Sequence, residues 1–299
     1  MLPEFFLKSI EVQYGAETAA RIVGGMRSAR RVSLRANRLK TDPEAVAALL
    51  TEHGIGFERL PWSEDAFLLT EAREDALRAL PAYEKGEIYL QSLSSMLPPL
   101  ALMPQAGKDI LDMAAAPGGK TAQMAAMTGN RANITACEIN KIRAERLQYN
   151  LRRQGASRVN VMVRDAAKLE DFFRFDQILL DAPCSGSGTL LETEPRGLSA
   201  FSEKLARNSA AVQLRLLRKA LTLLKPGGAM VYSTCSVLGI ENEDVLRAGM
   251  KGFKAEIEPL SLPGIDRVPT LPASLPGALC VCPTAEYEGF FMARIRKMG

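Results

Sequence analysis

The sequence is poor in several residue types and patterns that mark particular classes of protein. It has one histidine, His53, so a histidine-assisted catalytic mechanism is not favoured. No run reaches the ~18 apolar residues that a membrane-spanning helix needs. The N-terminal stretch carries Glu4 and Lys8 where a secretory leader would have an apolar core, so we expect no leader. These absences favour a protein of the cytoplasm with no membrane partner.

Cysteine is also scarce, with five residues in 299 and no regular spacing. An odd number of cysteines without a framework is typical of a reducing compartment, which predicts free thiols and a cytoplasmic location. Cys280 and Cys282 form a C-x-C pair, but no second pair or histidine lies nearby, so they do not indicate a zinc site. We expect no metal, and we expect these two residues and Cys137 to lie in strands.

Positive charge is concentrated near the N-terminus. Residues 1–40 hold eight Lys or Arg and three acids, a net charge of +5, whereas the remainder of the chain has −1. Such a segment suits docking to phosphate, although a charge run is more often a solvated helix face. The candidate nucleic-acid-binding residues are Arg27, Arg30, Arg31, Arg35, Arg38 and Lys40.

The hydrophobic pattern changes along the chain. The first part mixes helices and short strands, and predicts a small α/β domain over residues 1–80. Its expected elements are a helix over Phe5–Met26 that ends at Gly24–Gly25, a strand over Val32–Leu39, a helix from Pro43 to His53, and strands near 55–60 and 66–69. From Gln91 onward apolar strands alternate with helices, which is typical of a doubly wound, mostly parallel sheet. We expect this larger domain to cover residues 81–299.

The strands and helices of the larger domain follow one another regularly. Strands are predicted at 110–113, 134–137, 159–163, 177–180, 229–232 and 289–295, with helices at 120–127, 141–154 and 205–224. Lys225–Gly228 is expected to be a sharp helix-to-strand turn. A proline-rich stretch before the last strand is expected to be irregular.

The loop after the first of these strands is the best candidate for a cofactor site. It reads Asp112-Met-Ala-Ala-Ala-Pro-Gly-Gly-Lys-Thr, and its two glycines allow a ligand to approach the backbone closely. Glu138 ends the next strand and could bind ribose hydroxyls, and Asp165 after the third could reach an adenine amino group. The loop lacks the G-x-G-x-x-G of a dinucleotide site, and Ala114 stands where a phosphate-binding P-loop needs glycine.

Two cysteines follow the next two strands, in Asp181-Ala-Pro-Cys184-Ser-Gly and Tyr-Ser-Thr-Cys235-Ser. Most single cysteines are buried apolar residues, but two at adjacent strand ends, one beside Asp181, indicate a site. Carbon 5 of cytosine becomes nucleophilic only after a group adds at carbon 6, and a thiolate is suited to that addition. An acid near N3 and a base for the carbon-5 proton are also needed. Asp181 and Cys184 are the available groups.

These motifs resemble the Sun/Nop family of RNA cytosine-5 methyltransferases, in particular the bacterial members that act on 16S rRNA. The similarity covers nearly the whole chain. It runs through Ser33–Lys40, Gly86–Gln91, Ser94–Met96, the A-A-P-G-G-K loop, D-A-P-C-S-G, Y-S-T-C-S, Glu241-Asn242-Glu243 and Glu288–Phe291. The resemblance implies a seven-stranded Rossmann-like sheet with one antiparallel strand, and S-adenosyl-L-methionine as cofactor.

The resemblance also implies roles for individual residues. Cys235 would attack carbon 6, Cys184 would assist release of the product, Asp181 would contact the cytosine, and Lys120 would arrange that acid. The implied cofactor-binding residues are Ala114, Ala115, Ala116, Pro117, Gly118, Gly119, Lys120, Glu138, Arg143, Asp165 and Asp181. The sequence departs from the family in Leu190–Arg196, where relatives are usually basic, and in lacking a histidine near Pro283–Glu286.

The expected function is therefore formation of 5-methylcytosine in RNA by a monomer, with rRNA favoured over tRNA. A DNA cytosine-5 methyltransferase would instead use Cys184 as the nucleophile. A non-catalytic RNA-binding assembly factor would need neither cysteine. The base must be flipped out or unpaired to reach a thiol at a strand end.

Overall fold

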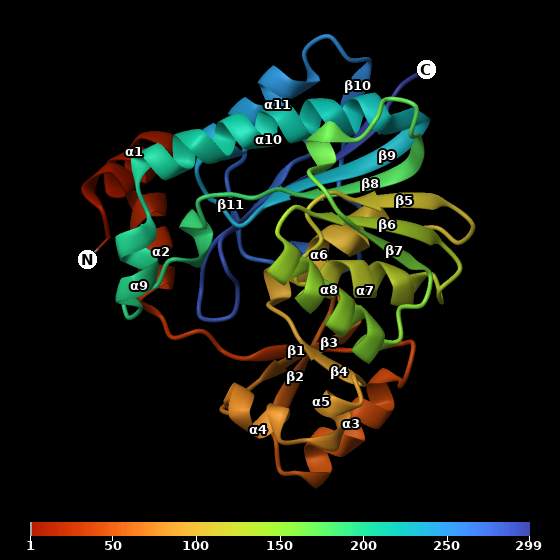
Figure 1. The fold of residues 1–299 in the computed structure, drawn as a ribbon. Helices are drawn as coiled ribbons and strands as arrows, with labels where there is room; N and C mark the ends of the chain where they lie inside the picture. The colour runs from red at the N-terminus through yellow and green to blue at the C-terminus, as the bar shows by residue number, and fades with distance from the viewer. Residues whose placement is uncertain (1) are drawn as a thin grey trace.

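A computed structural model describes residues 2–299 of the chain, with the side chains of residues 195 and 196 outside that description. It contains a small antiparallel sheet and a large mixed sheet, which lie one below the other in Figure 1. The small sheet has the order β2-β3-β1-β4, and its strands are β1 Ser33–Ala36, β2 Phe57–Leu60, β3 Ser63–Leu69 and β4 Ile88–Leu90.

The large sheet is built around five parallel strands in the order β7-β6-β5-β8-β9. β13 adds to β9 in the antiparallel direction, and β10 pairs with the far edge of β13. With β11 and β12 the described sheet has nine strands, two more than the family resemblance implies. β11 and β12 extend the same edge. The strands are β5 Asp109–Asp112, β6 Asn133–Glu138, β7 Val159–Val163, β8 Phe175–Asp181, β9 Leu224–Thr234, β10 Ala255–Glu258, β11 Thr270–Leu271, β12 Leu279–Val281 and β13 Phe290–Lys297.

Helices cover both faces of the large sheet, because successive strand residues point to opposite sides. In β8, Ile178 and Leu180 pack with α1, α2, α10 and α11, whereas Leu179 packs with α6 and α7. The helices are α1 Glu4–Tyr14, α2 Ala16–Arg27, α3 Pro43–Glu52, α4 Glu74–Arg78, α5 Pro81–Glu84, α6 Leu93–Leu102, α7 Gly119–Met127, α8 Lys141–Gln154, α9 Pro195–Ala200, α10 Glu203–Leu223 and α11 Glu243–Met250. Short 3₁₀ helices are η1 Ala166–Lys168, η2 Ser187–Thr189, η3 Gly239–Glu241 and η4 Ile265–Arg267. The predicted doubly wound fold is confirmed.

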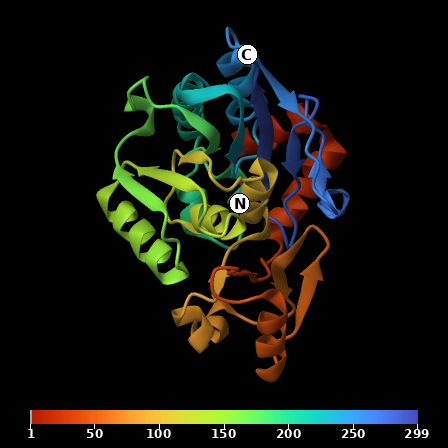
Figure 2. The same ribbon diagram turned by 90° about the vertical axis from the view of Figure 1, so that its right-hand side faces the viewer.

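The N-terminal helix differs from the prediction. It is divided at Gly15, which has φ 78°, and its second half continues through Gly24–Gly25 to Arg27. A Cβ atom on Gly25 would lie 1.9 Å from the carbonyl oxygen of Pro283, so this glycine allows close packing and does not stop the helix. Figure 2 shows α1 and α2 in red beside the blue C-terminal segments.

Consequently α1 and α2 share a hydrophobic core with the large sheet, through buried residues that include Phe6, Ile10 and Met26. The division of the chain at residue 80 stays a prediction. One helix was not anticipated, and one predicted strand begins earlier than expected. α6 forms despite Pro98 and Pro99, and β9 begins at Leu224 and runs through the predicted turn. Among the described residues no helix is long and apolar enough to cross a membrane.

Candidate active site

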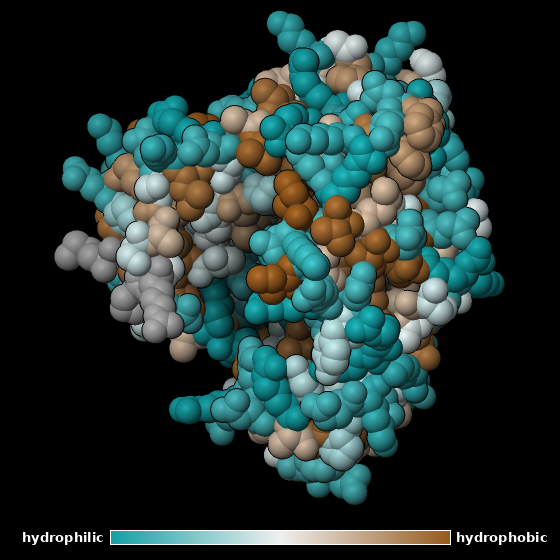
Figure 3. Space-filling view, in the orientation of Figure 1, coloured by the Kyte–Doolittle hydropathy of each residue, from teal (hydrophilic) through white to brown (hydrophobic). Residues whose placement is uncertain are grey.

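The carboxyl ends of the parallel strands meet at one edge of the large sheet. β5 ends at Asp112, β6 at Glu138, β8 at Asp181 and β9 at Thr234. In open α/β sheets this edge is where ligands bind. Figure 3 shows a hollow in the molecular surface between the lobe of α1, α2 and α9 and the rest of the molecule, with apolar residues gathered beside it.

The two sequence-predicted cysteines are in contact at this edge. The Sγ atoms of Cys184 and Cys235 lie 3.0 Å apart, and both thiols are half-buried and free. A backbone hydrogen bond from Gly188 to the carbonyl of Cys235, 2.9 Å long, ties the two loops together. The hydrogen bond with Cys235, together with burial, raises the pKa of the Cys184 thiol well above its usual value. The paired thiols therefore have unequal environments.

Asp181 and Lys120 form an ion pair beside the thiols, with 2.8 Å between Oδ2 and Nζ. Asp181 also accepts a hydrogen bond from Ser233 at 2.7 Å, and Lys120 donates one to Ser95 at 2.6 Å. Burial is the largest single effect on the pKa of Lys120 and lowers it. The charge of Asp181, its hydrogen bond, and the nearby Cys235 and Asp112 together outweigh burial, so the pKa is raised. Lys120 is thus a fixed positive charge between the acid and the thiol. The resemblance named neither serine as functional.

The loop from Ala114 to Lys120 lines a cavity together with Asp112 and Asp181. Gly118 has φ 108°, a conformation that other residues rarely adopt. A Cβ atom on Gly119 would lie 2.7 Å from the ring of Tyr89. The two glycines are therefore required by backbone geometry and by close packing.

Asp112 is buried at the floor of this cavity. Its Oδ2 atom accepts a hydrogen bond of 2.6 Å from Thr121, whereas Oδ1 has no partner among the described residues. Burial raises the pKa of Asp112 to about 6. Sequence reasoning treated Asp112 only as the start of the loop, although an acid at the end of a buried strand is a usable signal.

Glu138 and Asp165 lie where the sequence predicted, at the ends of neighbouring strands. Glu138 is 3% exposed and pairs with Arg143 at 3.4 Å. Arg143 also donates to the carbonyl of Ala116 at 3.0 Å, which links α8 to the loop. Asp165 caps η1 through the backbone of Ala167 at 2.9 Å. Among the described residues, no group of three or more Cys, His, Asp or Glu could hold a metal ion.

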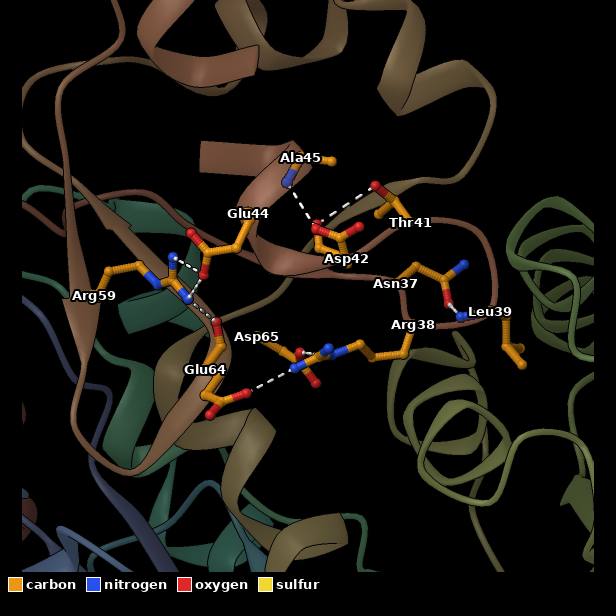
Figure 4. Close-up of polar contacts among 10 residues, drawn as sticks. All are labelled: Asn37, Arg38, Leu39, Thr41, Asp42, Glu44, Ala45, Arg59, Glu64 and Asp65. Carbon is orange, nitrogen blue, oxygen red and sulfur yellow. Dashed lines mark hydrogen bonds and ion pairs between the residues drawn. The ribbon is translucent and has the colours of Figure 1, made fainter. Parts of the chain in front are cut away.

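The basic N-terminal residues are largely engaged within the protein. Arg27 pairs with Glu192 of the Leu190–Arg196 loop at 2.8 Å. Arg38 contacts Glu64 and Asp65, as Figure 4 shows. The positive charge of these arginines is partly neutralised by their neighbours.

Four other residues of this set also have internal partners. Arg30 donates to the carbonyl groups of Thr284 and Tyr287, Arg31 pairs with Glu58 and Glu286, and Lys40 donates to the carbonyl of Lys85. Arg35 is only 2% exposed and donates to Gln91 and Gln154. The structure corrects the prediction at Arg35, because a buried guanidinium that joins two segments presents no surface to RNA.

Helix α8 carries a second concentration of positive charge. Lys141, Arg146 and Arg152 are exposed on it, and none forms an ion pair with a described residue. Tyr149 lies among them and is 53% exposed. Sequence reasoning missed this face because α8 was considered only as a helix between two strands.

Comparison with known proteins gives matches over nearly the whole chain. The family described as 16S rRNA methyltransferase RsmB/F matches residues 99–296. A second model, described as the ferredoxin-like domain of RsmF/B-like methyltransferases, matches residues 2–74.

Curated relatives carry the name ribosomal RNA small subunit methyltransferase F. The protein of Shewanella loihica is 37% identical over 281 residues, which are 90% of this chain and 57% of the relative. That of Pectobacterium atrosepticum is 38% identical over 278 residues, with the same shares covered. The chain thus spans 57% of the length of these two relatives.

Solved structures share the fold. A methyltransferase homolog protein from Pyrococcus horikoshii has a TM-score of 0.84 and 33% identity, and covers 99% of this chain and 100% of its own. The structure of NSun6 from the same organism, solved with SFG, has a TM-score of 0.87 and 23% identity, and covers 99% of this chain and 98% of its own. The second likeness concerns the fold alone.

Proposed function

The chain belongs to the RsmB/F family of 16S rRNA methyltransferases, and we propose that it transfers a methyl group from S-adenosylmethionine to carbon 5 of a cytosine in ribosomal RNA. The observation that carries the proposal is the contact between two thiols, 3.0 Å apart at the ends of adjacent strands, beside the Asp181–Lys120 ion pair. Methylation of carbon 5 needs a nucleophile, an acid and a base, and this cluster offers all three.

The cavity suits S-adenosylmethionine. The unpartnered Oδ1 atom of Asp112 can accept a hydrogen bond from a cationic amine, which the methionine part of the cofactor carries. The loop from Ala114 to Lys120 can surround the cofactor, while Glu138 and Asp165 lie at strand ends where ribose and adenine would bind. When bound, the cofactor supplies an electrophilic methyl group.

In the proposed first step, the Cys235 thiolate adds to carbon 6 of the cytosine. The carbon 5–carbon 6 electron pair moves through carbon 4 onto N3, and N3 takes a proton from solvent. The Asp181 carboxylate accepts a hydrogen bond from this N3–H until the proton is lost on release of the base. Lys120 holds Asp181 in place through their ion pair. Carbon 5 can then accept the methyl group.

In the second step the carbon-5 proton is removed. Its electron pair re-forms the carbon 5–carbon 6 double bond, and the Cys235 thiolate leaves. Cys184 is the proposed base, because its sulfur lies beside that of Cys235. The raised pKa keeps Cys184 protonated before the reaction, so this proton passes to solvent before the Cys184 thiolate takes the carbon-5 proton.

Exchange of each cysteine tests this assignment. Cys235→Ala should form no covalent RNA adduct, whereas Cys184→Ala should accumulate one, because the adduct forms but is not resolved. Denaturing gel electrophoresis of protein incubated with rRNA and S-adenosylmethionine would show the adduct as a slow band. Adduct formation by Cys235→Ala, but not by Cys184→Ala, would favour the alternative nucleophile and contradict the proposal.

The substrate is proposed to be rRNA, with a cytoplasmic monomer as the acting species and the exposed arginines of residues 27–40 among its RNA contacts. The family match over residues 99–296 supports rRNA as the substrate. Bisulfite sequencing of total RNA from a deletion strain would identify the target, because one rRNA cytosine should lose its methyl group. Loss of a tRNA signal instead would indicate tRNA as substrate. A protein that binds RNA but does not bind S-adenosylmethionine would be an assembly factor.

A further inference from the structure

The two cysteine loops meet at the side chain of Glu241, which the proposed mechanism does not use. Glu241 is fully buried at the end of η3. Its Oε1 atom accepts a hydrogen bond of 2.7 Å from the backbone N–H of Ser185. Its Oε2 atom accepts one of 2.5 Å from Oγ of Ser185 and one of 2.7 Å from Oγ of Ser236. One carboxylate thus binds the residue after Cys184 and the residue after Cys235.

Glu241 is itself held by neighbouring elements. Gln213 of α10 donates to Oε1 at 3.3 Å and to the carbonyl of Pro183 at 2.9 Å. The hydroxyl of Tyr232, in β9, donates to the backbone carbonyl of Glu241 at 2.5 Å. The carboxylate therefore has a fixed position relative to the sheet and to α10.

The next residue, Asn242, supports the second loop from the same side. Its Nδ2 atom donates to the carbonyl of Ser236 at 2.9 Å, and its Oδ1 atom accepts from the hydroxyl of Thr234 at 2.5 Å. Cys235 lies between these two anchored residues. The position of its thiol is thus set by contacts on both sides.

The burial of Glu241 is unusual because no Lys or Arg pairs with it in the described part of the chain. Neutral donors satisfy its oxygens. A buried carboxylate without a counter-ion costs free energy, and apolar packing would serve folding better. Its placement between the two thiol loops provides a functional reason for that cost.

We propose that Glu241 is a positioning residue that holds Cys184 and Cys235 at the separation and orientation needed for attack and release. The proposal rests on the proposed function, because it concerns the same two thiols. The two steps occur on one carbon–carbon bond of the base, so both sulfur atoms must reach it without a large rearrangement. A misplacement of about 1 Å can cost about a hundredfold in rate.

The test uses Glu241→Ala and Glu241→Gln, with dibromobimane as a probe that becomes fluorescent when it joins two neighbouring thiols. Glu241→Ala should slow cross-linking of Cys184 to Cys235 about tenfold and lower kcat about a hundredfold, while the Kd for S-adenosylmethionine changes by less than about threefold. Glu241→Gln keeps the shape and most hydrogen bonds, so both rates should stay within about threefold of wild type.

Glu243 provides a matched control. It is a buried carboxylate two residues away, and it accepts a hydrogen bond of 3.3 Å from the backbone of Ser274. Among the described residues it has no hydrogen bond to either cysteine loop. The Glu243→Ala variant should keep the wild-type rate of cross-linking between Cys184 and Cys235 and the wild-type kcat. The proposal is overturned if Glu241→Ala keeps the wild-type cross-linking rate, or if Glu243→Ala slows it equally.

If Glu241→Ala does not fold, Ser236→Ala removes one of the hydrogen bonds and leaves the carboxylate in place. It should slow cross-linking several-fold, and a wild-type rate in this variant would also overturn the proposal. Cross-linking needs neither RNA nor cofactor. If the wild-type protein cross-links rapidly but methylates no RNA, the proposed function is refuted. The role of Glu241 is then still tested by the cross-linking rates of its variants.

Discussion

Asp112 and Glu138 are both buried at strand ends, but only one oxygen of Asp112 has a partner in the described part of the chain. The Asp112 pKa of about 6 in the folded protein lies above the ordinary value of 3.8. The folded state therefore binds this proton more tightly than the unfolded state. The associated stability is present below pH 3.8 and is lost as the pH rises through about 6.

Asp112→Asn should remove this pH dependence. In the absence of cofactor the variant should be more stable than wild type at pH 7, by at most about 3 kcal/mol, and the difference should vanish near pH ~4. Urea unfolding between these pH values measures it. Asp109→Asn is the control, because Asp109 lies on the same strand with its side chain 49% exposed. If the free energy of unfolding of Asp112→Asn changes with pH as it does in the wild type, the raised pKa of Asp112 is contradicted.

Single residues could be predicted where a motif follows directly on a strand. Cys184, Cys235 and Asp181 have this property, since parallel strands deliver their carboxyl ends to one edge. Ser95 and Glu241 could not be assigned a role in this way. Ser95 lies in α6 and binds Lys120, 25 residues away in the chain. Glu241 lies in η3 and binds Ser185, 56 residues away.

At the scale of elements, the bounds of α8 are predicted correctly, but its exposed basic face is not. Its buried face packs on the sheet through Leu147 and Leu151, which is what helical spacing indicates. Its exposed face has a different character, because Lys141, Arg146 and Arg152 are exposed there and form no ion pair with a described residue. A basic helix beside a proposed RNA site is a candidate contact for phosphates.

Replacement of these three residues by glutamine should weaken RNA binding through loss of charge. If each neutralises one phosphate, the slope of log K against log salt concentration should become shallower by about 2. The value of kcat should not change, because α8 carries none of the reacting groups. Filter binding at several salt concentrations measures the slope.

Lys204, Arg207 and Arg218 on α10 offer a comparison triple substitution, because they are also exposed and lie on another helix, where Arg207 pairs with Glu203. That variant should keep the wild-type slope. If both triple variants lose the same RNA affinity, net charge governs RNA binding and no particular surface does.

Element boundaries were hardest to predict at glycine and proline. Gly15 divides the first helix while Gly24 and Gly25 continue it, because the surroundings of each glycine decide its effect. Pro98 and Pro99 are buried within α6, where tertiary packing outweighs their poor helix propensity. These outcomes depend on contacts with distant segments.

At the scale of the whole molecule, Arg35 joins the small sheet to helix α8, which packs on the large sheet. It donates to Gln91 at 3.1 Å and to Gln154, the last residue of α8, at 3.0 Å. Burial lowers its pKa to about 10. Asn37 adds a hydrogen bond of 2.7 Å to the carbonyl of Gln154. The end of α8 is thus attached to β1.

Arg35→Met should destabilise the protein by about 3 kcal/mol, because two hydrogen bonds to a charged group are lost and their partners remain buried. Arg38→Met is the comparison, since its ion pairs are exposed and should contribute less than about 1 kcal/mol. Chemical denaturation of both variants measures the difference. If Arg35→Met and Arg38→Met have the same free energy of unfolding, Arg35 is not a structural link.

The sequence by itself determined the alternation of strands and helices, the doubly wound sheet and the loops that carry Cys184 and Cys235. These follow from local periodicity and from the rule that parallel strands end at one edge. Only the tertiary structure decided that α1 and α2 join the large core, that Arg35 is buried and that Glu241 binds both cysteine loops. Such contacts join residues far apart in the chain, and their energies depend on burial and geometry that no local pattern records.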